Sequence, residues 1–534
     1  MLAERLTIGA PLESAMAEVA RSTRVGRGGK RSSTAYGIKV APKRTLGKRR
    51  NDGTWQPGWE TVLNALGLRF LAYVIRAAIA GICRLFNSVF LLSLPLAVLL
   101  FLTSTDFLVL TAVNDSFNQL FFDEMGLTFE HERRDEVEVL KTQVLKFAYW
   151  YVLIFSLFHW RTIYGYLKTW PHWSLLLICL AAGALHSIEP IKVGTNTALI
   201  IVGLCTAVLF ARANAESEHY DALYKAVFIP MLVLHVASIG IFFLYDTPLI
   251  EFLLSSGRYG GLAGNPNTLG ATIVLGYWAA ISLVLSASAS FFFRLTAVVT
   301  IPLFLLHVVM SGSGTALVGV IVVTGVVFWL RILAFFKPAT RHVINGAGAV
   351  LLIMVLLGTL VSTTPTELYL AFTTSLGKDQ TLTGRTELWD VARGAISQRP
   401  YFGWSFDSHA SVMSLGAFDI NFNHYHNGYL DTLVAGGFVL LALVLYNVSR
   451  FLRAFFLAFR KDSTAFPLIL PLVILLFLNF SEYSLLRPNS PIWQIYVVAF
   501  VMLTYQQKDR LLSRFMRKSK PAAPRSRKRQ LRWA

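Results

Sequence analysis

The chain has 534 residues, of which 54% are hydrophobic and only 15% are charged, and its formal net charge is +19. This composition excludes an ordinary soluble domain, and the basic residues gather at the two ends and in short loops, where they suit a membrane surface better than nucleic acid. The three cysteines have no C-x-x-C spacing and predict neither a disulfide framework nor a zinc site.

The first 87 residues precede the first long apolar run. Residues 1–58 lack the apolar core of a signal peptide and scatter Arg and Lys among Gly and Ser, so they predict a disordered, basic cytoplasmic tail. Residues 59–87 are more apolar, but Arg69, Arg76 and Arg84 fall on one helical face. Because arginines near the middle of a helix oppose insertion, we expect an interfacial amphipathic helix there.

Long apolar runs dominate the rest of the chain. A hydrocarbon core of about 30 Å requires about 20 apolar residues per helix. The runs predict an all-α fold, a polytopic transmembrane helix bundle of about twelve spans. The expected spans are 88–112, 144–160, 173–188, 193–211, 224–244, 267–286, 289–309, 314–335, 346–362, 429–447, 466–481 and 491–506.

The loops between these runs fix the expected orientation. Lys and Arg concentrate in alternate short loops and in the basic tail 508–534, which the positive-inside rule assigns to the cytoplasm. Both termini are therefore expected inside. The opposite face receives an acidic loop at 114–142 and the long loop 363–427, between the spans of 88–362 and those of 428–507.

The 363–427 loop is long compared with the other connections, and long loops in compact proteins are usually functional or disordered. This one contains TGRTELWDVARGAI, which predicts a short helix capped by Thr383, followed by Pro400 and Gly403 and then by HYHNGYL. We therefore expect an ordered loop with short helices.

Three polar residues of this face lie at the boundaries of expected spans: Arg258, Arg385 and His426. A guanidinium is a planar fork of donors suited to phosphate oxygens, and two of them suit a diphosphate. A histidine can take a proton from an attacking hydroxyl near neutral pH. Together they indicate group transfer from a phosphorylated donor.

Other interpretations of these residues stay open. The two arginines would also suit contacts with lipid headgroups, and His426 would also suit a capping or packing role. His424 and His426 do not share a helical face and have no evident further ligands, so no metal site and no cofactor are expected.

Four motifs in this order resemble those of the O-antigen ligase and polysaccharide polymerase superfamily. Arg258 precedes a G-x-x-x-N-P-N turn, Arg385 opens R-x-x-x-W, Pro400 precedes Gly403, and His426 opens H-N-x-Y-L. The matching positions are Gly261, Asn265, Pro266, Asn267, Trp389, Asn427, Tyr429 and Leu430, with the neighbouring His424 as a supporting residue. One departure is SGSG from Ser311, where many relatives have a Ser-Arg pair.

The resemblance implies a metal-independent multi-span glycosyltransferase of the GT-C-like type in a bacterial inner membrane. In that picture Arg258 and Arg385 bind the diphosphate of an undecaprenyl-diphosphate-linked glycan donor on the periplasmic face, and His426 is the general base. The implied partners are this donor, a glycan or lipid-linked acceptor, membrane lipids, and a chain-length regulator or flippase, without nucleic acid.

The expected function is polymerisation of repeat units into exopolysaccharide, capsule or O-antigen. Ligation of the glycan to lipid A core is the close alternative, because only the acceptor differs. A transporter or flippase of the polysaccharide pathway would also use outer arginines, but it should show broken helices in corresponding positions of two halves, and no such pairing is evident. A non-catalytic scaffold would leave Arg258, Arg385 and His426 unexplained.

Overall fold

The computed structural model describes most of the chain from Gly81 onward and short pieces before it. The described residues are 47–49, 55–57, 77–78, 80–82, 84–106, 109, 133–215, 220–244, 254–255, 257–336, 340, 385–406, 424–460, 462–480 and 482–518. They belong to two units, Met1–Ala80 and Gly81–Ala534.

The first unit contains one described pair of strands. Strand β1 (Gly47–Arg49) runs antiparallel to β2 (Trp55–Pro57), with Lys48 opposite Gln56. The rest of the predicted basic tail lies outside the described residues. Of the predicted interfacial helix at 59–87, the described residues 77–78, 80–82 and 84–86 are helical.

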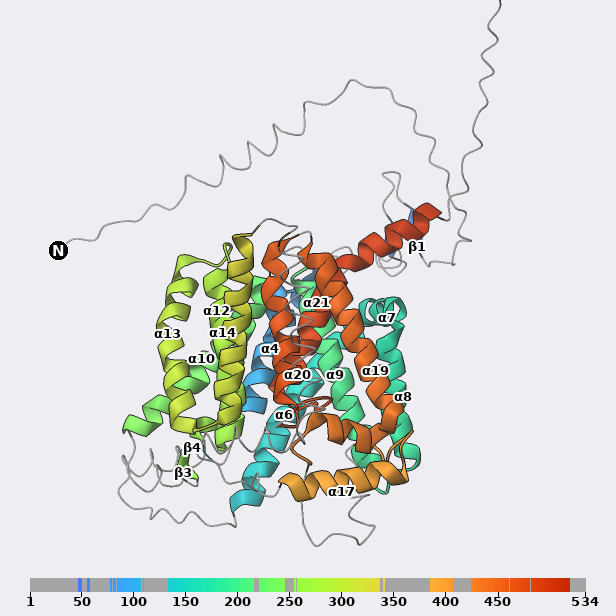
Figure 1. The fold of residues 1–534 in the computed structure, drawn as a ribbon. Helices are drawn as coiled ribbons and strands as arrows, with labels where there is room; N and C mark the ends of the chain where they lie inside the picture. Colours follow the sequence, from blue (N-terminus) through green and yellow to red (C-terminus); the bar gives the residue numbers. More distant parts are fainter. Residues whose placement is uncertain are drawn as a thin grey trace, which may run out of the picture. The chain divides into compact units, whose positions relative to one another are not determined.

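The second unit is built from helices (Figure 1). Its α-helices are α4 (Val89–Ser104), α6 (Arg133–Phe158), α7 (Trp160–Thr169), α8 (Pro171–Ala182), α9 (Pro190–Ala213), α10 (Asp221–Leu244), α12 (Pro266–Leu285), α13 (Phe291–Ser311), α14 (Gly314–Ala334), α17 (Arg385–Gln398), α19 (Gly428–Phe459), α20 (Leu470–Leu478) and α21 (Pro491–Lys518). Shorter elements are the strands β3 (Leu254–Ser255) and β4 (Arg258–Tyr259) and the 3-10 helices η1 (Gly183–Leu185), η2 (Gly261–Ala263) and η4 (Ser463–Ile469).

Several of these helices have the length and composition of membrane spans. Among the described residues, 6 helices are long and apolar enough: Ala80–Ser104, Pro190–Ala213, Asp221–Phe243, Pro266–Leu285, Phe291–Ser311 and Gly428–Phe459. Shorter apolar helices are Pro171–Leu185, Gly314–Trp329, Thr464–Leu478 and Pro491–Tyr505. The chain is therefore a polytopic helical membrane protein, as its composition predicts.

Most of the predicted spans coincide with helices of the structure. The predicted span 346–362 lies outside the described residues, and each of the others overlaps a helix. The span predicted at 144–160 forms the second half of α6, a helix that is not among the candidate spans because its first half is charged.

Helix α12 is central to the packing of the second unit. It contacts α10, α13 and α14, and Trp278 on it is fully buried and donates a hydrogen bond to the carbonyl oxygen of Pro467, at 2.9 Å. Gly276 allows α13 to approach closely, since an added Cβ atom would lie 2.5 Å from the Phe304 ring. Small residues at such crossings are typical of membrane bundles. The start of α12 is thus held on a well-packed helix.

Helix α19 is broken near its beginning. Gly436 and Gly437 have non-helical dihedral angles, with φ of +61° at Gly437. Glycine is the residue that tolerates such angles. The break separates a short first segment, Gly428 to Ala435, from the apolar remainder, and this segment follows directly on the end of the long loop.

Candidate active site

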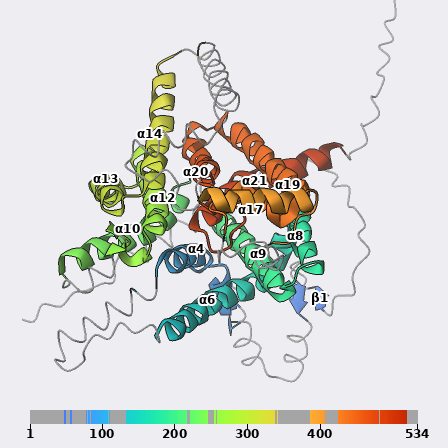
Figure 2. The same ribbon diagram turned by 60° about the horizontal axis from the view of Figure 1, so that its bottom comes forward.

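The residues singled out in the sequence lie toward one end of the second unit. Figure 1 shows the β3–β4 hairpin and α17 at this end, here called the α17 end. Figure 2, in which this end comes forward, shows α17 lying across the bundle, and α17 contacts α19. The candidate residues form two groups, one at the start of α12 and one at the start of α19.

The first group is organised by the side chain of Arg258 on β4. Its Nε donates a hydrogen bond to the carbonyl oxygen of Ser311 at 3.0 Å, and its Nη2 donates to Oδ1 of Asn267, also at 3.0 Å. The guanidinium therefore joins the start of α12 to the turn between α13 and α14. A guanidinium held by two acceptors is preorganised for further anionic contacts.

The turn that leads from Arg258 into α12 is fixed by its own sequence. Asn265 is the N-cap of α12, and its Oδ1 accepts hydrogen bonds from the backbone N–H of Asn267 at 2.8 Å and of Thr268 at 3.4 Å. Pro266 occupies the first helical turn, where its lack of an N–H costs nothing. Gly264 has φ of +69° and contacts Asp106, so a side chain has no room there. The N-P-N motif thus positions Asn267 for Arg258.

The SGSG departure has a structural counterpart. Gly312 has φ of +53°, and a Cβ atom added to it would lie 3.5 Å from Nε of Arg258. Arg258 therefore brings its cationic group to the SGSG turn between α13 and α14.

The second group begins with α17, the helix predicted in TGRTELWDVARGAI. Arg385 is its first residue, and the Arg385 side chain lies outside the part of the chain that the structure describes. Trp389, one turn later, donates a hydrogen bond from Nε1 to the carbonyl oxygen of Tyr425 at 3.0 Å. This bond connects the entry of the long loop to its exit, across the undescribed residues 407–423.

His426 lies where the loop meets α19. Its φ of +48° is unusual for a residue with a side chain, and such backbone strain is common at functional sites. The backbone N–H of His426 donates to Nδ1 of His424 at 3.3 Å, and the two rings have centroids 4.0 Å apart. Nδ1 of His424 is therefore an acceptor, which leaves the proton of a neutral ring on Nε2.

Asn427 and Gly428 hold this turn in place. Asn427 is the N-cap of α19, and its Oδ1 accepts from the backbone N–H of Tyr429 and of Leu430 at 3.0 and 3.1 Å. The backbone N–H of Gly428 lies 2.9 Å from the carbonyl oxygen of Asn479 and 3.0 Å from that of Glu482. Asn427 thus has a capping role, and the turn that carries His426 is anchored to the segment after α20.

Two residues near the histidines were not predicted from the sequence. The ring of Tyr483 lies 5.8 Å from that of His424, and the guanidinium of Arg487 lies 3.5 Å above the Tyr483 ring. Both belong to the short turn 482–490, which carries no motif of its own. The fold brings the cation of Arg487 close to His424 and His426, although no sequence motif marks it.

The segment after α17 packs against the break in α19. Backbone N–H groups of Trp404 and Ser405 donate to the carbonyl oxygens of Val434 and Ala435 at 2.8 and 2.9 Å, and that of Phe438 donates to the carbonyl oxygen of Pro400 at 2.8 Å. These bonds satisfy backbone groups that the break would leave unpaired. The Pro-Gly pair of the sequence thus marks a docking point for the loop.

Gly403 at this docking point provides a stability test. It has φ of +64°, and an added Cβ atom would lie 2.5 Å from backbone atoms of Val434 and Gly436, which have no freedom to move aside. We expect Gly403→Ala to lower the free energy of unfolding by about 2 kcal/mol or more. Thermal unfolding of the purified protein in detergent measures the effect.

Gly394→Ala is the matched control for this substitution. Gly394 is in α17, and an added Cβ atom would meet nothing within 4 Å. Alanine is favoured over glycine inside a helix by about 1 kcal/mol, so the midpoint of unfolding should stay the same or rise. Equal midpoints for the two variants would contradict the docking role of Gly403.

Metal ions in proteins are usually held by several His, Cys, Asp or Glu side chains together. Among the residues that the structure describes, no three His, Cys, Asp or Glu side chains gather closely enough to hold a metal ion. The cations and histidines of the α17 end suit anionic oxygens and proton transfer.

The fold and these groups define a multi-pass membrane protein whose candidate functional residues lie toward the α17 end. Residues 298–445 match the family model described as O-Antigen ligase. This match confirms the resemblance found in the sequence and supports assignment to the O-antigen ligase and polysaccharide polymerase superfamily, and with it a membrane enzyme that transfers lipid-linked glycans. A comparison with curated proteins finds no match.

The matched region contains the motif residues of the second group but not those of the first. Arg385, Trp389, His424, His426 and Asn427 fall inside residues 298–445. Arg258, Asn265 and Asn267 precede it. Their assignment to the same site rests on their sequence motifs and on their position at the α17 end of the unit.

Proposed function

We propose that this protein is a metal-independent glycosyltransferase of the GT-C-like type, with about twelve spans in a bacterial inner membrane. It moves a glycan from an undecaprenyl-diphosphate-linked donor to a glycan acceptor on the periplasmic face, and so polymerises repeat units into exopolysaccharide, capsule or O-antigen. The hydrogen bond from Trp389 to the carbonyl oxygen of Tyr425 carries the proposal. It brings the two loop motifs of the matched family region together beside His426.

The reaction follows from the chemistry of the three principal residues. An acceptor hydroxyl attacks the anomeric carbon of the donor, the bond from that carbon to the diphosphate oxygen breaks, and undecaprenyl diphosphate leaves. His426 takes the hydroxyl proton as general base. Arg258 and Arg385 bind the diphosphate and stabilise the charge that develops on it.

The other residues have supporting roles in this proposal. Asn265 and Asn267 fix the turn that holds Arg258. Trp389 and Asn427 fix the backbone on both sides of His426, and His424 accepts a hydrogen bond from its N–H. None of these groups needs to bond directly to substrate.

An assay with purified protein tests the proposal. The protein is given an undecaprenyl-diphosphate-linked oligosaccharide alone, and the lipid and glycan products are separated. A polymerase releases undecaprenyl diphosphate and lengthens the remaining lipid-linked glycan. Absence of both products, in a preparation that binds the donor, would refute the polymerase assignment.

Adding lipid A core to the same assay separates the close alternative. A ligase releases undecaprenyl diphosphate only when this acceptor is present. A flippase or transporter releases none under either condition, while it moves the intact donor across the membrane of a proteoliposome.

A further inference from the structure

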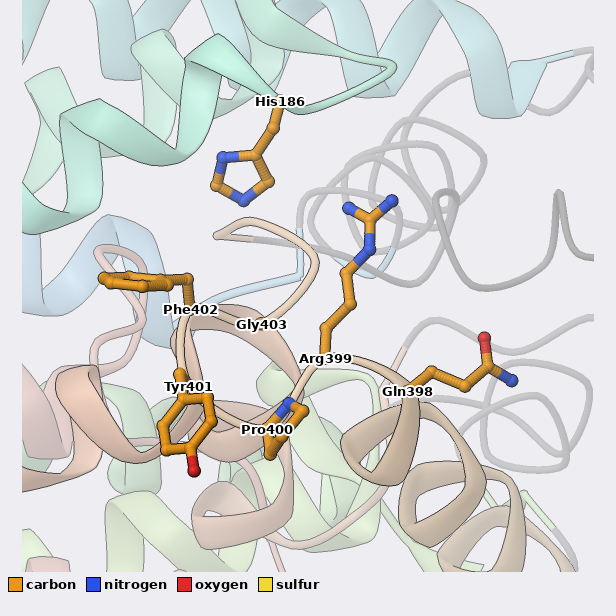
Figure 3. Close-up of a pocket in the computed structure, with 7 residues that line it drawn as sticks. All are labelled: His186, Gln398, Arg399, Pro400, Tyr401, Phe402 and Gly403. Carbon is orange, nitrogen blue, oxygen red and sulfur yellow. The ribbon is translucent and has the colours of Figure 1, made fainter.

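A pocket that contains both charged and apolar side chains lies at the far end of α17. It is an open pocket with a volume of about 370 Å³, lined by His186, which follows η1, and by residues 398–403, which end α17 and follow it. Figure 3 shows the side chains of His186 and Arg399 extending from opposite walls toward the same space. Its volume falls within the range of small-ligand pockets.

The cation of this pocket is held in place. The guanidinium of Arg399 lies 4.0 Å above the ring of Trp404, and the Trp404 indole donates a hydrogen bond to the carbonyl oxygen of Ala395 at 2.9 Å. A stacked guanidinium keeps the donors at its edge available for hydrogen bonding. Burial, and secondarily the charge of Arg399, lower the pKa of His186, so its imidazole is a neutral hydrogen-bonding group near neutral pH.

Large exposed apolar side chains belong to the pocket lining and to the residues that flank His186 in the chain. Tyr401 and Phe402 are 67% and 70% exposed, and Leu185 and Ile191 beside His186 are 90% and 85% exposed. Such an exposed set is unfavourable in water but suits the interfacial layer of a membrane. A pocket with such neighbours is suited to a position at the level of the lipid headgroups.

We propose that this pocket binds the phosphate headgroup of a membrane lipid, the one that anchors the acceptor glycan. Arg399 and His186 supply donors for phosphate oxygens, and the exposed apolar side chains contact the lipid chain. This inference rests on the proposed function, in which donor and acceptor are both lipid-linked, and it assigns a second headgroup site.

The position of the pocket fits this role. Arg385 and Arg399 lie at opposite ends of α17, and a helix of this length spans about 20 Å at 1.5 Å per residue. A hydroxyl that reacts beside His426 belongs to the end of the acceptor that is remote from its lipid. The acceptor lipid should therefore be separated from the donor diphosphate by the length of an oligosaccharide, as α17 provides.

Lipid binding by the full-length protein tests the proposal directly. Native mass spectrometry counts bound undecaprenyl phosphate, with undecaprenol as the matched lipid without phosphate and inorganic phosphate as competitor. We expect two bound undecaprenyl phosphates for the wild type and one for the double variant His186→Gln, Arg399→Gln, whose affinity at this pocket should fall at least about tenfold.

Arg393→Gln is the matched control. Arg393 is on the same helix, its side chain is 70% exposed, and it pairs with Asp390. Its replacement removes one positive charge from the segment next to the pocket, as the replacement of Arg399 does, so two lipids should still bind. An equal loss in Arg393→Gln and in the double variant would show a non-specific charge effect and overturn the proposal.

Other outcomes would also overturn it. Equal binding of undecaprenol would indicate an apolar site, and full displacement by inorganic phosphate would indicate a site for free phosphate. In the transfer assay the double variant should raise KM for a lipid-linked acceptor and leave a soluble oligosaccharide acceptor unaffected; loss with both acceptors would indicate a glycan subsite instead.

The binding count does not depend on catalysis. If the wild type binds two phosphate lipids but transfers no glycan, the proposed function fails while the pocket assignment holds. If transfer occurs and the double variant binds and transfers as the wild type does, the pocket assignment fails alone.

Discussion

Replacing His426 by asparagine should reduce glycan transfer by about 10²- to 10⁴-fold, the contribution usual for a general base. Asparagine is chosen because it accepts positive φ more readily than most residues, and His426 has φ of +48°. The variant therefore keeps the turn between the loop and α19 but lacks a basic ring nitrogen. Release of undecaprenyl diphosphate measures turnover.

The backbone strain at this position makes a second variant informative. Alanine lacks both the ring and the tolerance of positive φ, so His426→Ala should lose turnover and also lower the midpoint of thermal unfolding. His426→Asn should unfold close to the wild-type midpoint. Wild-type turnover in the asparagine variant would remove His426 from the mechanism, whatever the alanine variant shows.

The sequence predicts the parts of this site that depend on neighbouring residues. Asn265 followed by Pro266 predicts the start of α12, and Asn427 followed by Gly428 predicts the start of α19, because capping and first-turn preferences act within a few residues. The motif that begins at Arg385 likewise predicts α17. Apolar runs predict most of the helices for the same reason.

Contacts between distant segments are not encoded in this local way. The bond from Arg258 to the carbonyl oxygen of Ser311 joins residues far apart in sequence, and Arg487 reaches the histidine pair through Tyr483 from a turn without a motif. The break of α19 at Gly436 is stabilised by the loop segment after Pro400. Each depends on how helices pack, which a hydrophobic pattern does not specify.

Replacing Arg258 by lysine should weaken donor use strongly although the charge is kept. The guanidinium donates from Nε to Ser311 and from Nη2 to Asn267, and an ammonium group is too compact to span both acceptors. Loss of charge-assisted hydrogen bonds worth about 1.5–3 kcal/mol each should lower kcat/KM by about 10²-fold. The transfer assay at limiting donor concentration measures this change.

Arg294→Lys is a closely matched control for this substitution. Arg294 also donates from Nε and Nη2 to two acceptors, the carbonyl oxygens of Ala289 and Ala287, at 2.8 and 2.9 Å. It lies near the start of α13, whereas Ser311, whose carbonyl oxygen accepts from Arg258, is the last residue of that helix. A loss of stability that comes from exchanging a bridging arginine for lysine should appear in both variants. A rise in KM for the donor should appear only in Arg258→Lys.

The two variants together distinguish a structural role of Arg258 from a role in binding the donor. A diphosphate clamp predicts a higher KM for the donor in Arg258→Lys, with a similar unfolding midpoint for both proteins. If Arg258→Lys lowers the midpoint and leaves the KM for the donor unchanged, Arg258 only joins α12 to the turn after α13. The diphosphate would then have to be bound by other cations, of which Arg487 beside the histidine pair is the first to replace.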